Sequence, residues 1–240
     1  MDCDWHSFLD VLPRWMRGPV DEMGKETLRE LRLRTGRGPL LIFDGRAWEQ
    51  PGRVTEQDLQ FCVNAATGYS PWASASAAFG YLTLPGGHRM GLCGEVIVKE
   101  NVMTGYKTLR SLCIRLARDI PISLPQDCLN WGSTLILGAP GWGKTTLLRA
   151  LARALSAKSQ VAVVDERQEL FPEGFSRGLG MDVLSGCPKI TGLSLVLRTM
   201  GPEYIALDEI TAQVDAAAVC QAVGCGVKLL ATAHASTLED

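Results

Sequence analysis

The sequence lacks cysteine pairs at the spacing that zinc-binding or redox sites require. Its eight cysteines are scattered along the chain, and no CxxC motif occurs among them. Because metal and redox sites need clustered ligands, this scatter predicts small buried hydrophobic side chains in a reducing compartment.

Strong charge, a signal peptide and long apolar runs are also missing. The net charge is -2, which gives no indication of nucleic-acid binding. The longest run without Asp, Glu, Lys or Arg, residues 59–87, is interrupted by Pro71 and is too polar to span a membrane. The first residues contain neither a basic segment nor an apolar run. We therefore expect a soluble, cytoplasmic protein that meets a membrane only through a partner or a surface.

What is present is an ordinary globular composition, with 46% hydrophobic and 21% charged residues in a chain of 240. This length favours one or two domains. The segment 120–125 contains two prolines, and the character of the sequence changes after it. We expect a smaller α+β domain at residues 1–120, a linker at 121–130 and a second domain at 131–240.

Three local patterns define the first domain. Apolar residues recur at helical spacing from Trp5 to Met16, with Pro13 weakening the helix, and favour a face toward the core over one that docks on a membrane or partner. Thr55 and Asp58 resemble a capping box. Two apolar runs flank the turn at residues 85–87 and predict a β-hairpin.

The second domain alternates short apolar runs with helical patterns. We expect strands at residues 134–137, 161–164, 204–207 and 227–231, and helices at 144–156 and 213–223. Runs rich in Leu and β-branched residues that alternate with helices favour a parallel sheet buried on both faces.

A phosphate-binding motif opens this domain. Its residues are Gly138, Ala139, Pro140, Gly141, Trp142, Gly143, Lys144 and Thr145, which match GxxxxGK[ST] and are followed by Thr146. The motif lies between an expected strand and an expected helix, so backbone N–H groups and the helix dipole can face phosphate. Lys144 is placed to reach the β- and γ-phosphates of ATP, and the Thr145 hydroxyl to ligate Mg²⁺.

Two of the expected strands end in Asp-Glu. These pairs are Asp165-Glu166 and Asp208-Glu209, and both are expected at the strand edge that carries the phosphate loop. We assign Asp208 to the Mg²⁺ shell and Glu209 to the activation of water. Glu166 is the alternative base, which Arg167 could pair with and hold in a supporting role.

Two further residues are candidates for the same site. His234 ends the last apolar run and could sense the γ-phosphate, although a lone histidine is commonly a satisfied surface or core residue. Arg198 precedes the Asp208 strand and could bind phosphate in cis or across a subunit interface. The alternative is an ordinary surface arginine.

Several segments resemble the stage III sporulation protein AA family of endospore-forming bacteria. The matching segments are residues 31–37, 80–89, 113–118, 141–149, 165–167, 181–184, 188–189, 208–210 and 232–234. That family is similar to the traffic ATPases of type II and type IV secretion and type IV pili, which are RecA-like hexamers. The resemblance implies an α/β fold, a RecA-like P-loop NTPase core with a mainly parallel sheet, preceded by the smaller α+β domain.

The resemblance also implies roles for four segments. Residues 138–145 correspond to the Walker A motif, 165–167 to the Asp box, 208–209 to the Walker B motif and 232–234 to the His box. It implies a homo-oligomeric ATPase, a hexamer, that works with a membrane-protein partner in a channel complex between mother cell and forespore.

The sequence departs from that pattern at two places. Thr211 stands where a glycine usually follows the Walker B motif. The sequence stops at Asp240, where the family leads us to expect further sheet and helices, so that the chain is either a fragment or has a reduced C-terminal part.

Two other functions stay open at this point. One is a RecA-like ATPase acting on nucleic acid, for which the best support is the group Arg29, Arg32, Arg34 and Arg37. A solvated face or ion pairs between subunits explain that group more simply, so we consider nucleic acid unlikely. The other is a scaffold that binds ATP and assembles without turnover. The arginines that could act across a subunit interface are Arg115, Arg118 and Arg198.

Overall fold

The computed structural model describes residues 3–69, 80–211 and 213–235, and the chain divides into two compact units between Arg118 and Asp119. The predicted linker at 121–130 ends in a short 3-10 helix, η3 (Gln126–Asn130). Cys128 of η3 is buried in a hydrophobic cluster of the second unit, so this part of the segment belongs to that unit.

The N-terminal unit is built on a six-stranded antiparallel sheet. Its elements are α1 (Trp5–Asp10), α2 (Arg14–Gly24), β1 (Glu30–Arg34), β2 (Leu40–Phe43), β3 (Arg46–Glu49), α3 (Glu56–Ala66), β4 (Tyr81–Thr83), the 3-10 helix η2 (Pro85–Gly87), β5 (Arg89–Lys99) and β6 (Val102–Arg115). The strand order is β3-β2-β1-β6-β5-β4. Strands β1 to β3 were not predicted, whereas the hairpin around η2 was.

The N-terminal helices pack against one face of this sheet. The expected helix from Trp5 to Met16 is divided in two, because Pro13 cannot continue it and instead precedes the first turn of α2. Trp5, Phe8 and Met16 are buried in the core, which confirms the core-facing interpretation for these residues, whereas Trp15 is 41% exposed. The predicted capping box is confirmed, since the side chain of Thr55 and that of Asp58 both bond backbone N–H groups at the start of α3.

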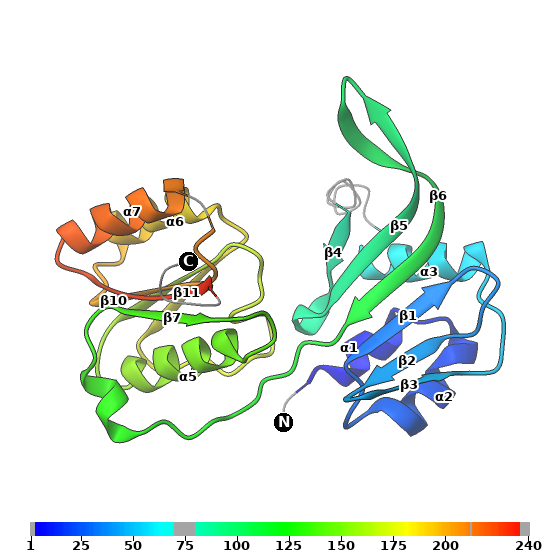
Figure 1. The fold of residues 1–240 in the computed structure, drawn as a ribbon, viewed down its shortest axis with the longest axis horizontal. Coiled ribbons are helices and arrows are strands. Elements are labelled where there is room, and N and C mark those ends of the chain that lie inside the picture. The colour runs from blue at the N-terminus through cyan, green and yellow to red at the C-terminus, as the bar shows by residue number, and fades with distance from the viewer. Residues whose placement is uncertain (1–2, 70–79, 212, 236–240) are drawn as a thin grey trace. The chain divides into compact units, whose positions relative to one another are not determined.

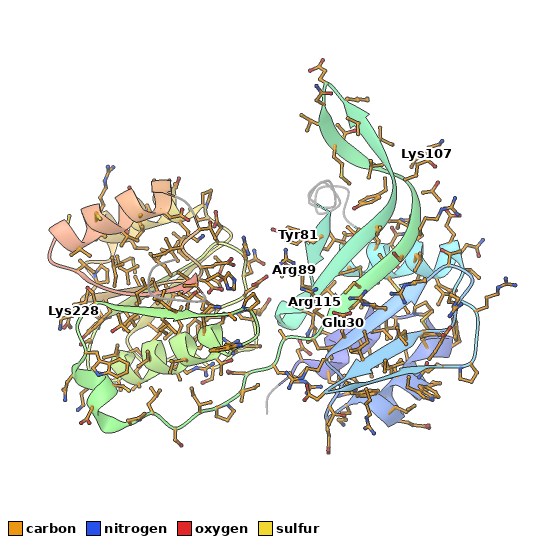
Figure 2. All side chains as sticks on the ribbon, viewed as in Figure 1. Glu30, Tyr81, Arg89, Lys107, Arg115 and Lys228 are labelled. Atoms are coloured by element: carbon orange, nitrogen blue, oxygen red, sulfur yellow. The ribbon has the colours of Figure 1, made fainter. Side chains whose placement is uncertain are left out.

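The other face of the sheet carries charged side chains. Arg115 and Glu30 point outward from neighbouring strands, with Nε to Oε2 at 3.2 Å, and the guanidinium of Arg89 lies 4.2 Å from the ring centroid of Tyr81 (Figure 2). Arg32 also pairs with Glu30. This division into an apolar and a charged face follows from the alternation of side chains along each strand.

Ion pairs within the unit engage most of the arginines once considered for nucleic acid. Arg29 bonds Asp44 at 2.7 Å, and Arg37 lies 3.3 Å from Glu49. These pairs lie within one chain, and ion pairs between subunits stay a prediction.

A buried histidine connects three segments of the N-terminal unit. His88 Nδ1 accepts a hydrogen bond from the N–H of Ala117, so its Nε2 carries the proton and donates to the carbonyl of Asp4, 2.9 Å away. Burial lowers the pKa of His88 and keeps the ring neutral. Gly86, with φ of +74°, lies so close to Asp4 that a Cβ would approach that side chain to 2.5 Å.

The distal half of the β5–β6 hairpin, residues 94–108, forms a two-stranded ribbon. Glu100 and Asn101, both with positive φ, make its turn. Three register shifts interrupt the pairing between the two strands. Four apolar residues of the ribbon are exposed, namely Val96, Ile97, Val98 and Val102. The ribbon extends away from the rest of its own sheet (Figure 1).

The C-terminal unit contains a five-stranded parallel sheet. Its further elements are β7 (Thr134–Gly138), α5 (Lys144–Ser156), β8 (Val161–Asp165), β9 (Met181–Ser185), α6 (Lys189–Thr199), β10 (Tyr204–Leu207), α7 (Gln213–Gly224) and β11 (Lys228–His234). The strand order is β7-β11-β10-β8-β9. All four predicted strands and both predicted helices are present, and β9 and α6 are additional.

Helix α5 lies on one face of this sheet, with α6 and α7 on the other (Figure 1). Every residue of β8 and β10 is buried, as expected for strands covered on both faces. The expectation is wrong for the edge strand β7, where Leu135 and Leu137 are 53% and 38% exposed. The described part of the chain has no helix long and apolar enough to cross a lipid bilayer.

The cysteines differ in part from the prediction. None of the eight, all among the described residues, forms a disulfide bond, and Cys62 and Cys128 are buried as expected. Cys93, Cys220 and Cys225 are exposed, so the interpretation of the cysteines as small buried hydrophobic residues is wrong for these three.

Candidate active site

The phosphate-binding loop connects β7 to α5. Gly138 ends the strand, and Gly141 and Gly143 turn the loop with φ of +80° and +79°. Gly143 precedes the first turn of α5, which no side chain caps. The N-terminal N–H groups of α5 therefore lie beside the loop without a capping side chain, as an anion site at a helix N-terminus requires.

Lys144, the first residue of α5, is only 9% exposed. Its Nζ donates to the carbonyls of Gly138 (2.8 Å) and Ala139 (3.0 Å), and lies 2.9 Å from Nδ1 of His234. These contacts hold the ammonium group inside the loop.

Asp208 follows β10 and lies beside the start of α5. Its Oδ1 accepts a hydrogen bond from Thr232 Oγ1 at 2.9 Å and is 3.5 Å from Thr145 Oγ1. Burial raises the pKa of Asp208, and the nearby charges of Asp165 and Glu209 add to the increase, while the bond from Thr232 opposes it. A carboxylate in this environment would be stabilised in its charged form by a cation.

The residues present fit Mg²⁺. A carboxylate oxygen and a hydroxyl oxygen 3.5 Å apart are the ligands that Mg²⁺ takes beside nucleotide phosphates. Within the described ranges, no three His, Cys, Asp or Glu side chains are arranged to hold a metal alone. Thr145 and Asp208 would thus share the ion with phosphate oxygens.

Glu209 and His234 connect the Asp208-Glu209 pair to the phosphate-binding loop. Oε1 of Glu209 lies 3.1 Å from Nε2 of His234, whose other ring nitrogen contacts Lys144. The Glu209 N–H donates to Thr232 Oγ1 at 2.8 Å, and its φ of +39° lies in the left-handed region. The structure therefore brings Lys144, His234 and Glu209 together in one continuous chain of contacts.

The Asp165-Glu166 pair is arranged differently from expectation. The buried carboxylate of Asp165 accepts hydrogen bonds from the N–H groups of Glu169, Leu170 and Phe171, at 2.8 to 3.0 Å. These bonds fix the loop after β8, so Asp165 is not a free carboxylate facing phosphate.

The expected pairing of Arg167 with Glu166 is wrong. Arg167 lies 3.0 Å from Oε2 of Glu209, and Glu166 instead lies 3.3 Å from Nζ of Lys189. The residue next in sequence was not the nearest in space, because parallel strands bring separate segments to one edge.

Arg198 is not part of the group of side chains in contact around Glu209, which is called the Glu209 cluster. It lies exposed in the last turn of α6, whereas Lys189 at the first turn of the same helix reaches the cluster. A role for Arg198 across a subunit interface stays a prediction.

The sequence reasoning missed Lys189 as a site residue. The signal was present, because Pro188-Lys189 is one of the segments shared with the sporulation family. Its buried position and its three oxygen partners emerge only from the fold.

A parallel sheet with a P-loop between its edge strand and the following helix defines a P-loop NTPase fold. Solved structures with this fold include the pilus retraction motor PilT with bound ADP (TM-score 0.66, 16% identity, 90% of this chain and 66% of that one). They also include the ATPase DotB from Legionella pneumophila (TM-score 0.61, 19% identity, 88% of this chain). This chain spans 63% of that DotB chain, and at these identities the likeness concerns the fold alone.

The chain belongs to the family described as sporulation stage III, protein AA, whose profile matches residues 14–240. It is 33% identical over 254 residues to stage III sporulation protein AA of Bacillus subtilis, covering 96% of this chain and 82% of that protein. It is also 29% identical over 249 residues to the protein SEEDLING PLASTID DEVELOPMENT 1 of Arabidopsis thaliana, covering 98% of this chain and 34% of that protein.

Proposed function

We propose that the protein is a Mg²⁺-dependent ATPase that resembles the traffic ATPases of type II and type IV secretion. In this proposal it powers or assembles a channel complex between mother cell and forespore, as a hexamer with a membrane-protein partner. The observation that carries the ATPase is the chain of contacts from Lys144 through His234 to Glu209, with Thr145 and Asp208 beside it.

Each residue has a definite task in the proposed reaction. The loop N–H groups and Lys144 bind the β- and γ-phosphates of ATP. Thr145 and Asp208 would hold Mg²⁺ together with the phosphates, and the ion would supply positive charge that offsets the charge on the transferred group. Glu209 accepts a proton from the attacking water and orients it in line with the γ-phosphorus atom. His234, in contact with both Lys144 and Glu209, links phosphate binding to the base.

The test is the variant Lys144→Met, which keeps most of the aliphatic stem and removes the charge. We expect nucleotide affinity to fall at least about 10-fold, because a charge-assisted hydrogen bond to phosphate contributes about 1.5–3 kcal/mol. The matched control is Lys158→Met, which removes an exposed lysine of the same unit. Titration with ATP, phosphate release and a thermal melt are measured for all three proteins.

The outcomes separate the candidate functions. Parental affinity in a folded Lys144→Met would show that the motif does not bind phosphate. ATP binding without phosphate release by the parent protein would favour the scaffold. Turnover that depends on single-stranded DNA and on low salt would favour the nucleic-acid ATPase.

A further inference from the structure

Lys189 is the one buried lysine of the described residues apart from Lys144. It is the first residue of α6 and is 7% exposed. An ammonium group is not buried at this level unless acceptors surround it, because desolvation of an unpaired charge is very unfavourable. The groups that accept hydrogen bonds from Lys189 therefore indicate which part of the structure its charge stabilises.

Three oxygen atoms from three elements face this ammonium group. The backbone carbonyl of Glu209, after β10, is 2.7 Å from Nζ. The carboxylate of Glu166, after β8, is 3.3 Å away, and that of Asp215, in the first turn of α7, is 3.6 Å away. Lys189 thus joins the segments after two central strands to the helix that follows one of them.

The bond to the Glu209 carbonyl acts on a strained part of the backbone. A non-glycine residue at φ of +39° persists only where the surroundings hold it. Lys189 holds the carbonyl of this residue, and Thr232 Oγ1 holds its N–H. The side chain of Glu209 is left to contact His234 and Arg167.

The same group of residues accounts for Thr211. The N–H and the hydroxyl of Thr211 both donate to Oδ2 of Asp215, at 3.1 Å and 3.3 Å. Asp215 is also the carboxylate that faces Lys189. The turn that usually contains glycine is therefore fixed here by side chains, through Asp215 and Lys189.

We infer that Lys189 is a positioning residue for the ATPase reaction. It fixes the backbone of Glu209 so that the carboxylate points at His234 and the γ-phosphate, and it couples this orientation to Glu166 and to α7. The inference rests on the proposed ATPase function. Nothing in it requires Lys189 to touch the nucleotide, so it predicts a loss of turnover and not of binding.

The experiment compares Lys189→Met with the control Lys158→Met in the full chain. We expect kcat to fall by about 10²-fold, the loss that a misplacement of about 1 Å can cause. The KM for ATP should stay within about 3-fold of the parent, because the phosphate-binding loop is intact. Lys189→Arg, which keeps the positive charge, should recover part of the lost turnover.

A second variant separates the two tasks of the ammonium group. Lys189→Met combined with Glu166→Gln removes one of the carboxylates left without its cation. If Lys189 only neutralises acidic groups, turnover in this double variant rises from that of Lys189→Met toward that of Glu166→Gln alone. If Lys189 holds the carbonyl of Glu209, turnover stays as low as in Lys189→Met.

Hydrogen exchange gives a readout independent of turnover. In Lys189→Met the amides of residues 208–211 should exchange about 10-fold faster or more, while Lys158→Met matches the parent. Parental exchange in this segment, or recovery of turnover in the double variant, would overturn the inference. If the parent protein releases no phosphate, the proposed function is overturned. Hydrogen exchange would still show whether Lys189 positions Glu209.

Discussion

Glu209 and Glu166 differ in their partners, and the difference decides which carboxylate we expect to activate water. Glu209 contacts His234, whose ring also reaches Lys144, whereas Glu166 pairs with Lys189. Glu209→Gln should lower turnover by about 10²-fold or more while ATP stays bound, because the general base is lost. Glu166→Gln should lower turnover less.

The two rates are compared at saturating ATP and Mg²⁺, with Glu173→Gln as the control for loss of an exposed carboxylate. If Glu166→Gln has no ATP turnover while Glu209→Gln still turns over ATP, the assignment of the two acidic motifs is reversed.

His88 gives the N-terminal unit a defined response to acid. Burial lowers its pKa in the folded state, while the unfolded chain binds a proton near pH 6.5. Between the lowered pKa of the folded state and about pH 6.5, the unfolded state therefore binds more protons, and stability falls as pH falls, by at most about 1.4 kcal/mol per pH unit.

Thermal melts at pH 7.5 and 5.5 measure this effect. His88→Gln should be less stable than the parent at pH 7.5 but lose less between the two pH values. The control His6→Gln removes an exposed histidine and should keep the parental difference. An unchanged acid response in His88→Gln would mean that other groups cause it.

The residues of the site that could be predicted are those that lie in recognisable sequence motifs. The phosphate loop, Asp208 and His234 lie at strand ends of one parallel sheet, so their positions in sequence already imply one edge. The partner of Arg167 could not be predicted, because it depends on β10 lying beside β8.

At the scale of elements, helix α6 is placed by a close contact with β8. A Cβ on Gly192 would lie 2.5 Å from Cγ1 of Val164. We expect Gly192→Ala to destabilise the unit by about 1–3 kcal/mol through overpacking. Its better helix propensity would offset about 1 kcal/mol of that loss.

A thermal melt and ATP turnover are measured together for this variant, because a shift of α6 also moves Lys189. Gly132→Ala is the control in the same unit, since no atom lies within 4 Å of its Cβ position. An equal or higher melting temperature for Gly192→Ala would show that α6 can move away without loss.

The two elements of the C-terminal unit that the sequence did not reveal, β9 and α6, share a physical cause. Strand β9 is at the sheet edge and has no fully buried residue, so it lacks the continuous apolar run of β8 and β10. Helix α6 buries few apolar side chains, among them Leu193 and Val196. Weak patterns of this kind become elements through tertiary packing.

For the whole molecule, the separate cores predict that the N-terminal unit folds alone. All members of its hydrophobic cluster precede Arg118, and Arg118 itself donates to the carbonyls of Lys25 and Leu28 within the unit. A chain of residues 1–118 should therefore unfold in one cooperative transition.

Circular dichroism and a urea titration of residues 1–118 test this expectation, with the full chain as reference. A sloping, non-cooperative transition, or one that becomes cooperative only when residues 119–240 are present, would show that the unit depends on the rest of the chain.

The ribbon at residues 94–108 bears on how the protein behaves when concentrated. Its outer edges pair with no strand of the described residues, and such edges, with exposed valines beside them, can recruit the same edge of another molecule. Bulges strengthen local twist and disrupt the ladder, and this ribbon has one register shift at its base and two within its length. A strand whose pairing is interrupted and twisted in this way is a poor template for a flat intermolecular sheet. We therefore expect the irregular pairing to oppose aggregation of this hairpin, which its exposed apolar side chains would otherwise favour.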